Sequence, residues 1–311
     1  MGYGKQSTRT FGKHTTTGKE LHSRLMSILY NDLTYPEGQF LSTLWTIMLT
    51  MDIAVLIPVI LGGFAALFIN YVADVLPWTR RFSQPFCTHC QTPFSWKEYL
   101  TLQACQHCGK RRSLRTWVVL VLTISTFVYF WLFPPRVLPL PLVMLVLIYF
   151  GIITVIDLEH RLILHPTSLA GAVLGLIVGT TIHSRADGLL LGAGMSLLGG
   201  LFGFGMLFLL YQFGALVARY RARRMQAAGQ APDDEEALGG GDVYLAGVLG
   251  LMLGWPFIVR ALTLGVLLGG LISFLFIVLL LVRRRYTADA LMTFIPYGPY
   301  FIIGAFYVLF L

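Results

Sequence analysis

The chain contains 311 residues, of which 56% are hydrophobic and 12% are charged, and its mean hydropathy is +0.71. Soluble domains carry about 25% charged residues, so this composition excludes a soluble enzyme and predicts an all-α, polytopic membrane protein. The net charge of +8 comes mainly from loops between apolar runs, where it favours contact with anionic membrane lipid over binding of nucleic acid.

Residues 1–43 form a polar segment that is rich in serine, threonine, glycine and lysine. The segment has no sustained apolar stripe, so we expect it to be mostly disordered. The first apolar run begins too far from Met1, and is too long, to be a secretory signal peptide.

Eight apolar runs follow, and each is predicted to be a membrane helix. A helix rises about 1.5 Å per residue, so about 20 residues cross a hydrocarbon core of about 30 Å. Two of the runs are short and contain glycine, which favours helices packed inside a bundle or half-spans that line a cavity. The eight runs are 44–72, 116–134, 138–156, 167–182, 187–213, 243–257, 259–282 and 292–311.

Lysine and arginine are concentrated in one set of loops. Successive loops alternate sides of the membrane, and cytoplasmic loops carry the excess of basic residues. One set holds fifteen of the 23 basic residues, whereas only Arg136, Arg185 and Arg260 lie at or beside the opposite loops. We therefore expect the first set in the cytoplasm and both termini outside. The cytoplasmic set consists of 73–115, 157–166, 214–242 and 283–291.

All four cysteines fall in the loop 73–115, in two CxxC pairs separated by fourteen residues. Each pair turns two thiolates toward one point, so two pairs predict a tetrahedral structural zinc site. Disulfides do not fit the reducing cytoplasm, while redox or iron–sulfur chemistry and a metal-free loop are the alternatives. With four thiolates present, His89 and His107 are not expected to be ligands. The predicted ligands are Cys87, Cys90, Cys105 and Cys108.

Two aspartates lie at the ends of separate apolar runs. Asp157 closes the run 138–156, and Asp242 follows the glycine triplet Gly239, Gly240 and Gly241. Carboxylates near bilayer depth are costly and usually functional, although a single aspartate at a helix end often only caps the helix. Two carboxyls held close share a proton and divide the roles of acid and base. The glycines would give Asp242 backbone freedom and let a substrate strand approach closely.

Several segments together resemble the prepilin peptidases, the type IV leader peptidase family of GxGD membrane aspartyl proteases. The resemblance covers about residues 55–311 and includes the cysteine loop. The other segments are GGFAALFINYVADVLP at 62–77, IDLEH at 156–160, EALGGGDV at 236–243, GLMLGW at 250–255 and IPYGPY at 295–300.

The resemblance implies an organisation and an activity. It implies a first membrane helix at 44–72, a four-cysteine zinc loop at 73–115 and a membrane-embedded peptidase core at 116–311. Asp157 and Asp242 would be catalytic, and zinc would be structural. The substrates would be pilin-like precursors, whose short basic leader ends in glycine and precedes an apolar helix. Cleavage would occur at the cytoplasmic face of the cell membrane.

The chain departs from the family pattern at three places. Tyr244 replaces a lysine that the family usually has two residues after its second aspartate. Pro166 lies farther from Asp157 than the corresponding proline of the family lies from its first aspartate. Bifunctional members use S-adenosylmethionine to methylate the new amino terminus, and they carry proline and glutamate after the second CxxC pair. The corresponding RRSLRTWVV at 111–119 has neither, so we expect cleavage without methylation.

Two functions from other classes compete with the peptidase. The first is a non-catalytic assembly factor whose cysteine loop docks a component of a pilus or secretion system. The second is a transporter in which the two carboxylates carry protons or cations. The paired CxxC loop and the glycine triplet favour the peptidase.

Overall fold

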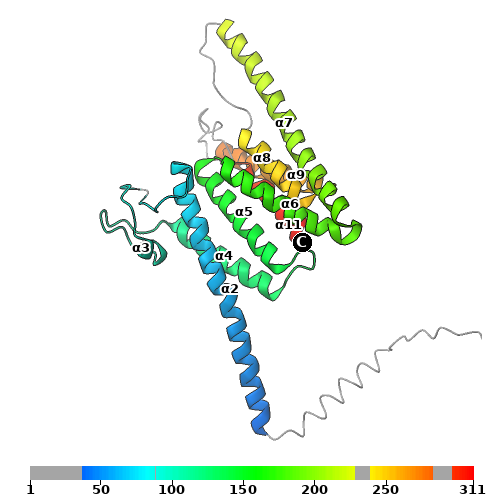
Figure 1. The fold of residues 1–311 in the computed structure, drawn as a ribbon. Coiled ribbons are helices and arrows are strands. Elements are labelled where there is room, and N and C mark those ends of the chain that lie inside the picture. Colours follow the sequence, from blue (N-terminus) through cyan, green and yellow to red (C-terminus); the bar gives the residue numbers. More distant parts are fainter. Residues whose placement is uncertain (1–36, 88, 228–238, 283–295) are drawn as a thin grey trace, which may run out of the picture. The chain divides into compact units, whose positions relative to one another are not determined.

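The computed structural model describes residues 37–87, 89–227, 239–282 and 296–311 (Figure 1). These residues are nearly all helical, and the only β pairing among them is an isolated bridge between Phe86 and Pro93. The predicted all-α class is confirmed. The helices are α2 Glu37–Thr79, α3 Trp96–Leu100, α4 Leu114–Leu132, α5 Leu140–His160, α6 His165–Asp187, α7 Leu189–Ala227, α8 Gly240–Leu253, α9 Phe257–Val282 and α11 Gly298–Phe310.

The chain divides into two compact units, residues 1–56 and 57–311. In the first unit the structure describes only the beginning of α2, which starts at Glu37 and therefore lies partly within the segment predicted to be a polar tail. The rest of that predicted segment, residues 1–36, lies outside the described residues. Both predicted functional centres belong to the second unit.

Each of the eight predicted apolar runs coincides with a helix. Within the described ranges, six helices are long and apolar enough to cross a membrane, whereas Gly240–Leu253 and Gly298–Phe310 are shorter apolar helices. The exact number of spans therefore stays a prediction. The six candidate spans are Val55–Thr79, Leu114–Leu132, Leu140–His160, His165–Arg185, Leu189–Gln226 and Phe257–Leu279.

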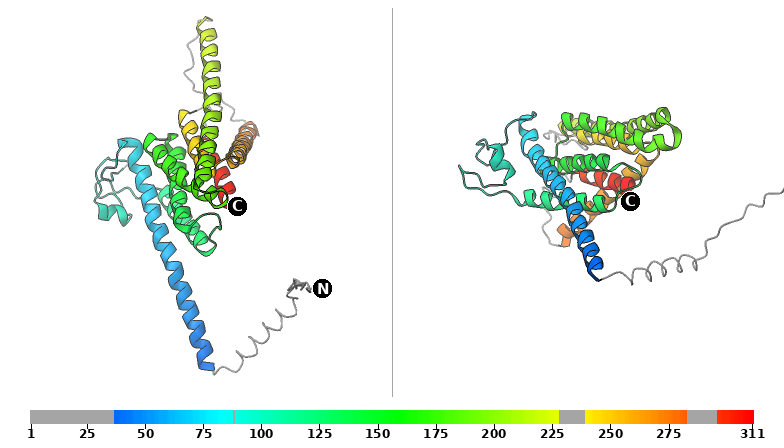
Figure 2. Two further views of the ribbon diagram at one scale, coloured as in Figure 1. Left: turned by 45° about the vertical axis from the view of Figure 1, so that its right-hand side comes forward. Right: turned by 60° about the horizontal axis from the view of Figure 1, so that its bottom comes forward.

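Helix α7 is longer than the sequence pattern indicates. It has 39 residues and continues to Ala227, whereas the apolar run ends at residue 213. The added segment is dominated by alanine and arginine, which have high helix propensity. Figures 1 and 2 show the carboxyl-terminal half of α7 extending away from the other helices of the second unit.

Two hydrophobic clusters organise the second unit. The larger one joins α5 to α8, α9 and α11 through buried residues such as Val146, Leu245 and Phe301. The other joins the end of α2 and the start of α4 to the cysteine loop and α5, through residues such as Ile69 and Tyr99. Helix α5 contributes to both clusters, so it connects the cysteine loop to the helical bundle.

Helices α6, α7 and α8 approach one another at the level of their backbones. A Cβ atom at Gly199 of α7 would lie 2.5 Å from the carbonyl oxygen of Gly250 in α8. Ser196, which is fully buried, donates a hydrogen bond of 2.7 Å to the carbonyl oxygen of Leu251. Small residues and interhelical hydrogen bonds are how apolar helices associate in lipid, where water does not drive them together.

We predict that Gly199→Ala destabilises the protein and that Gly194→Ala does not. Both glycines lie inside α7, and alanine improves helix propensity by about 1 kcal/mol at either position. A Cβ at Gly194 meets no atom within 4 Å, so only Gly199→Ala forces α7 and α8 apart. Thermal unfolding in detergent should show a lower midpoint for Gly199→Ala alone. Equal midpoints would contradict the close packing of these helices.

Candidate active site and metal centre

Asp157 lies in the last turn of α5, with 5% of its surface exposed. The helix ends directly after it, because Arg161 adopts a left-handed conformation at φ 52° and donates its backbone N–H to the carbonyl oxygen of Asp157 at 2.9 Å. The Oδ2 atom of Asp157 is buried, and no described side chain donates a hydrogen bond to it; the nearest backbone donor to the carboxylate is the N–H of Gly298. A carboxylate without a side-chain partner is available to a proton, a water molecule or a substrate.

Gly298, the first residue of α11, faces this carboxylate. A Cβ atom at position 298 would lie 2.5 Å from Oδ2 and 3.0 Å from Cγ of Asp157. No other residue type fits there without displacing the aspartate. Gly298, which belongs to a segment that carries part of the family resemblance, therefore packs against the candidate site.

Asp242 is half-buried in the first turn of α8. Gly239 caps this helix in an extended conformation, and Gly240 and Gly241 are its first two residues. None of the three adopts a positive φ, so the backbone freedom expected of the triplet is not used. Space is needed instead, because a Cβ at Gly241 would lie 2.8 Å from Cβ of Ile163. The amino end of a helix also favours a negative charge at Asp242.

The structure brings the two predicted aspartates together. Helix α5 ends, and helix α8 begins, on the same side of the bundle (Figure 1). Asp157 and Asp242 are near enough for their charges to act on each other. Two interacting carboxyls at a membrane helix end can hold one proton between them, which is the arrangement that acid–base catalysis by an aspartate pair requires.

An apolar groove of about 540 Å³ lies in the second unit, and Asp242 is not among the residues that line it. Its walls come from α6, α7 and α8, and they include His165, Phe204 and Tyr244. The ring of Tyr244 lies 5.6 Å from that of His165 and 5.9 Å from that of Phe204. The residue that departs from the family pattern thus contributes an aromatic wall where the family has a cation.

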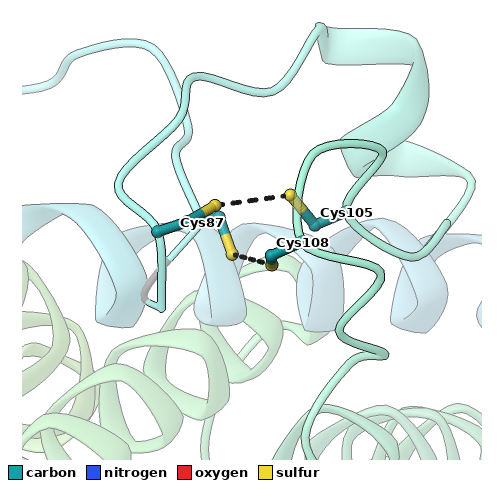
Figure 3. Close-up of side chains that lie close together, drawn as sticks. Cys87, Cys105 and Cys108 are labelled. Carbon is teal, nitrogen blue, oxygen red and sulfur yellow. Dashed lines mark hydrogen bonds between the residues drawn. The ribbon is translucent and has the colours of Figure 1, made fainter.

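The four cysteine sulfur atoms all lie within 4.8 Å of one another. The distance is 3.8 Å between the Sγ atoms of Cys87 and Cys108, and 3.6 Å between those of Cys90 and Cys105. Figure 3 shows thiols from both CxxC turns directed toward one point. A tetrahedral Zn²⁺ with Zn–S bonds of about 2.3 Å separates its sulfur ligands by about 3.8 Å. The donor set therefore fits a metal ion such as zinc.

The two CxxC turns make equivalent backbone hydrogen bonds. In the first, Gln91 N–H donates to Cys87 O at 2.8 Å and Cys87 N–H donates to Thr92 O at 2.8 Å. In the second, Gly109 N–H donates to Cys105 O at 2.8 Å, and Cys105 N–H donates to Lys110 O at 3.0 Å. His89 and His107 are exposed and do not belong to the cysteine group.

Hydrogen bonds prepare one of these thiols to bind a cation. The backbone N–H of Cys108 and the hydroxyl of Thr92 lower the pKa of Cys105 to about 6. The Thr92 hydroxyl also lowers the pKa of Cys90. Metals bind the thiolate form, so these hydrogen bonds favour the protonation state that a metal requires at Cys90 and Cys105, whereas the pKa of Cys108 is raised to about 11.

A polar network that the sequence analysis missed joins the cysteine loop to α5. Arg115, near the start of α4, forms ion pairs with Asp74 of α2 and Glu159 of α5. The hydroxyl of Tyr99 donates a hydrogen bond of 2.8 Å to Oδ2 of Asp74. Burial, and then the charge of Asp74, raise the pKa of Tyr99. The signal in the sequence was Asp74 itself, because a carboxylate directly after an apolar run, where the helix can continue, requires a partner.

A second arginine attaches this network to the loop. The guanidinium carbon of Arg112 lies 4.5 Å from the ring centre of Phe94 and 4.4 Å from that of Tyr99. Such cation–π contacts stabilise by about 0.5–2 kcal/mol each. Tyr99 therefore connects the aromatic packing of the loop to the ion pairs at the ends of α2, α4 and α5.

Comparison with known proteins agrees with this site. Residues 142–278 match the model of the Type IV leader peptidase family, a range that includes both aspartates and excludes the cysteine loop. The searches of curated proteins and of solved structures found no match. The family match supports the resemblance predicted from the sequence: residues 142–278, which hold both aspartates, are similar to the type IV leader peptidase family.

Proposed function

We propose that this protein is a membrane aspartic endopeptidase that removes the leader peptide from type IV pilin-like precursors at the cytoplasmic face of the cell membrane. The observation that carries the proposal is the meeting of Asp157 and Asp242, from the end of α5 and the start of α8, inside the family-matched region. The family supports a leader peptidase, and the buried carboxylate pair supports the aspartic type.

The mechanism follows from one proton shared by two carboxyls. The ionised carboxylate takes a proton from a water molecule while the water oxygen attacks the scissile carbonyl carbon. The protonated carboxyl stabilises the developing negative charge on the carbonyl oxygen. When the tetrahedral intermediate breaks down, the carboxyl that received the proton gives it to the leaving amine. The pair then again holds one proton, so the cycle is balanced.

The surroundings of Asp242 suit a substrate with glycine before the cut and an apolar helix after it. Gly240 has no atom within 4 Å of the position that a Cβ would occupy, so a substrate backbone can approach the aspartate closely. Tyr244, two residues after Asp242, lines the apolar groove of α6, α7 and α8 and points about 200° around the helix from Asp242. A precursor's apolar helix would lie in this groove, and the segment before it would pass around the start of α8 to reach Asp242.

We place the two aspartates at the cytoplasmic face because of where lysine and arginine occur in the loops. The loops that adjoin Asp157 and Asp242 belong to the set that holds most of the lysine and arginine residues. Such loops remain in the cytoplasm, where a newly made precursor presents its leader. This orientation also exposes the cysteine loop to a reducing compartment, which keeps thiols available to a metal.

We predict that Asp157→Asn and Asp242→Asn each reduce precursor cleavage by at least about 10²- to 10⁴-fold, the usual contribution of acid–base catalysis. Asparagine keeps the shape of the side chain but cannot share a proton. The measurement is processing of a pilin-like precursor by purified protein in lipid vesicles. Both variants should unfold at the same temperature as the wild type.

Two outcomes of this experiment would contradict the peptidase. Wild-type protein that folds and inserts but leaves the precursor intact would favour a non-catalytic assembly factor. Proton or cation flux that disappears in Asp157→Asn and Asp242→Asn would favour a transporter. Ion flux is therefore measured on the same vesicles as cleavage.

We further propose that Cys87, Cys90, Cys105 and Cys108 hold one structural Zn²⁺, which would supply folding free energy to the loop. Cys105→Ser should lose the metal and make residues 80–113 sensitive to protease, with a smaller effect on cleavage than on loop structure. His107→Ala, a change in the same turn, should keep the metal. Elemental analysis without zinc in the wild type, or unchanged zinc in Cys105→Ser, would refute the assignment.

Methylation of the product is not expected. Methyl transfer needs a base to accept the proton of the new amino group, and 111–119 contains no acidic residue. The nearby Glu98 is engaged by the backbone N–H of Ser95 at 3.1 Å, and Glu159 is paired with Arg115. Mass spectrometry of product made with S-adenosylmethionine present should show an unmodified first residue. An added methyl group would contradict the prediction.

A further inference from the structure

We propose that Arg115 is a positioning residue that holds the last turn of α5 in the orientation that directs Asp157 toward Asp242. The proposal rests on the proposed function, because it assigns Arg115 a role in the same site. It is argued from the ion pairs at the ends of α2, α4 and α5, none of which involves the two aspartates of the site.

The guanidinium group connects two helices at once. Its Nη2 atom pairs with Oδ1 of Asp74 on α2, and its Nη1 atom pairs with Oε2 of Glu159 on α5. The Arg115 side chain is 18% exposed and that of Asp74 is 9% exposed, so water screens this half of the network weakly. A planar fork with two diverging donors can make both bonds, whereas the single ammonium group of lysine cannot reproduce that geometry.

Helix geometry relates this ion pair to the candidate active site. Residues two apart in a helix point about 200° from each other. Glu159 is held toward α4, so Asp157 is directed to the opposite side, where Gly298 and Leu245 lie. Rotation of the last turn away from Arg115 would move the Asp157 carboxylate away from Asp242.

The last turn of α5 needs such a restraint because the helix ends there. Its final residue is His160, and Arg161 breaks the helix with a left-handed backbone. Terminal turns lack part of their backbone hydrogen bonding and fray easily. In this protein the Glu159 ion pair ties the final turn to α4, one residue before the break.

The cysteine loop supports the same arginine from its other side. Tyr99 donates to Oδ2 of Asp74, while Arg115 pairs with Oδ1. Asp74 is thereby held by the loop and by α4 together. The loop, the arginine and the last turn of α5 form one connected polar network, so the state of the loop reaches Asp157 without any direct contact between them.

If Arg115 only stabilised the fold, removing its Glu159 partner would change the unfolding temperature and not the catalytic rate. The exposed half of the network, Glu159, is 38% exposed, and exposed ion pairs contribute little to global stability. Removing its charge should therefore leave the unfolding temperature almost unchanged. The proposed positioning role of Arg115 instead predicts a local effect on the last turn of α5 and on the rate of the chemical step.

The experiment compares Glu159→Gln with Glu98→Gln in the full-length protein. Both remove one negative charge, but Glu98 belongs to α3 and its capping interaction with Ser95 can be kept by glutamine. Hydrogen–deuterium exchange of the amides at 157–160 should be about tenfold faster in Glu159→Gln, as expected when a charge-assisted hydrogen bond becomes neutral. Glu98→Gln should match the wild type.

Kinetics with a synthetic precursor, a basic leader ending in glycine and followed by an apolar helix, provide the second readout. For Glu159→Gln, kcat should fall about 10- to 100-fold, as for a catalytic group displaced by about 1 Å, while KM stays within about twofold. Arg115→Lys, which keeps a charge beside Asp74, should show the same split. If Glu159→Gln left the hydrogen–deuterium exchange rate at 157–160 unchanged, or left kcat unchanged, the positioning role of Arg115 would be refuted. If the wild type cleaved no precursor, the proposed function would fail, and the exchange rate alone would test the positioning role.

Discussion

The close approach of α6, α7 and α8 is the constraint on which the rest of the structure depends. In lipid, apolar side chains gain little by leaving one apolar environment for another, so helices associate where their backbones can come close. Gly199 and Ser196 provide such contact between α7 and α8. Helix α8 is shorter than the candidate spans, and this packing fixes its position. The position of Asp242, and therefore the pairing of the aspartates, follows from it.

The buried acids of the second unit fall into two classes. Asp74 is neutralised by Arg115 and accepts a hydrogen bond from Tyr99, which is the usual way for a buried carboxylate to be tolerated. Asp157 is equally buried, yet no side chain in the described part of the chain donates a hydrogen bond to its Oδ2 atom. The first acid is therefore structural. The second is kept in a costly environment, which a protein tolerates where the carboxylate has chemistry to perform.

Much of this organisation could be predicted from the sequence, for identifiable physical reasons. The apolar runs revealed the helices because membrane helices must be continuous and apolar. Asp157, Asp242 and the CxxC pairs stood out because charge and thiols are rare in such a composition. The role of the glycine triplet was predicted less well. A glycine can be needed for an unusual backbone conformation or for the room that a missing side chain leaves. In this structure Gly241 leaves room for Ile163.

The polar network could not be predicted, because its partners are distant in the sequence. Arg115 pairs with residues 41 and 44 positions away, and the sequence alone does not specify which helix ends meet. The same limit applies to Gly298 and Asp157. The boundary between α7 and its loop was also missed, since helix propensity extends the helix beyond its apolar portion.

The length of α8 has a consequence for water. A helix of 14 residues is about 21 Å long, about 9 Å less than a typical hydrocarbon core. Such a helix can reach one face of the membrane but not both. Hydrolysis consumes a water molecule, so in the proposed peptidase the amino end of α8, which carries Asp242, would be the end at the aqueous face.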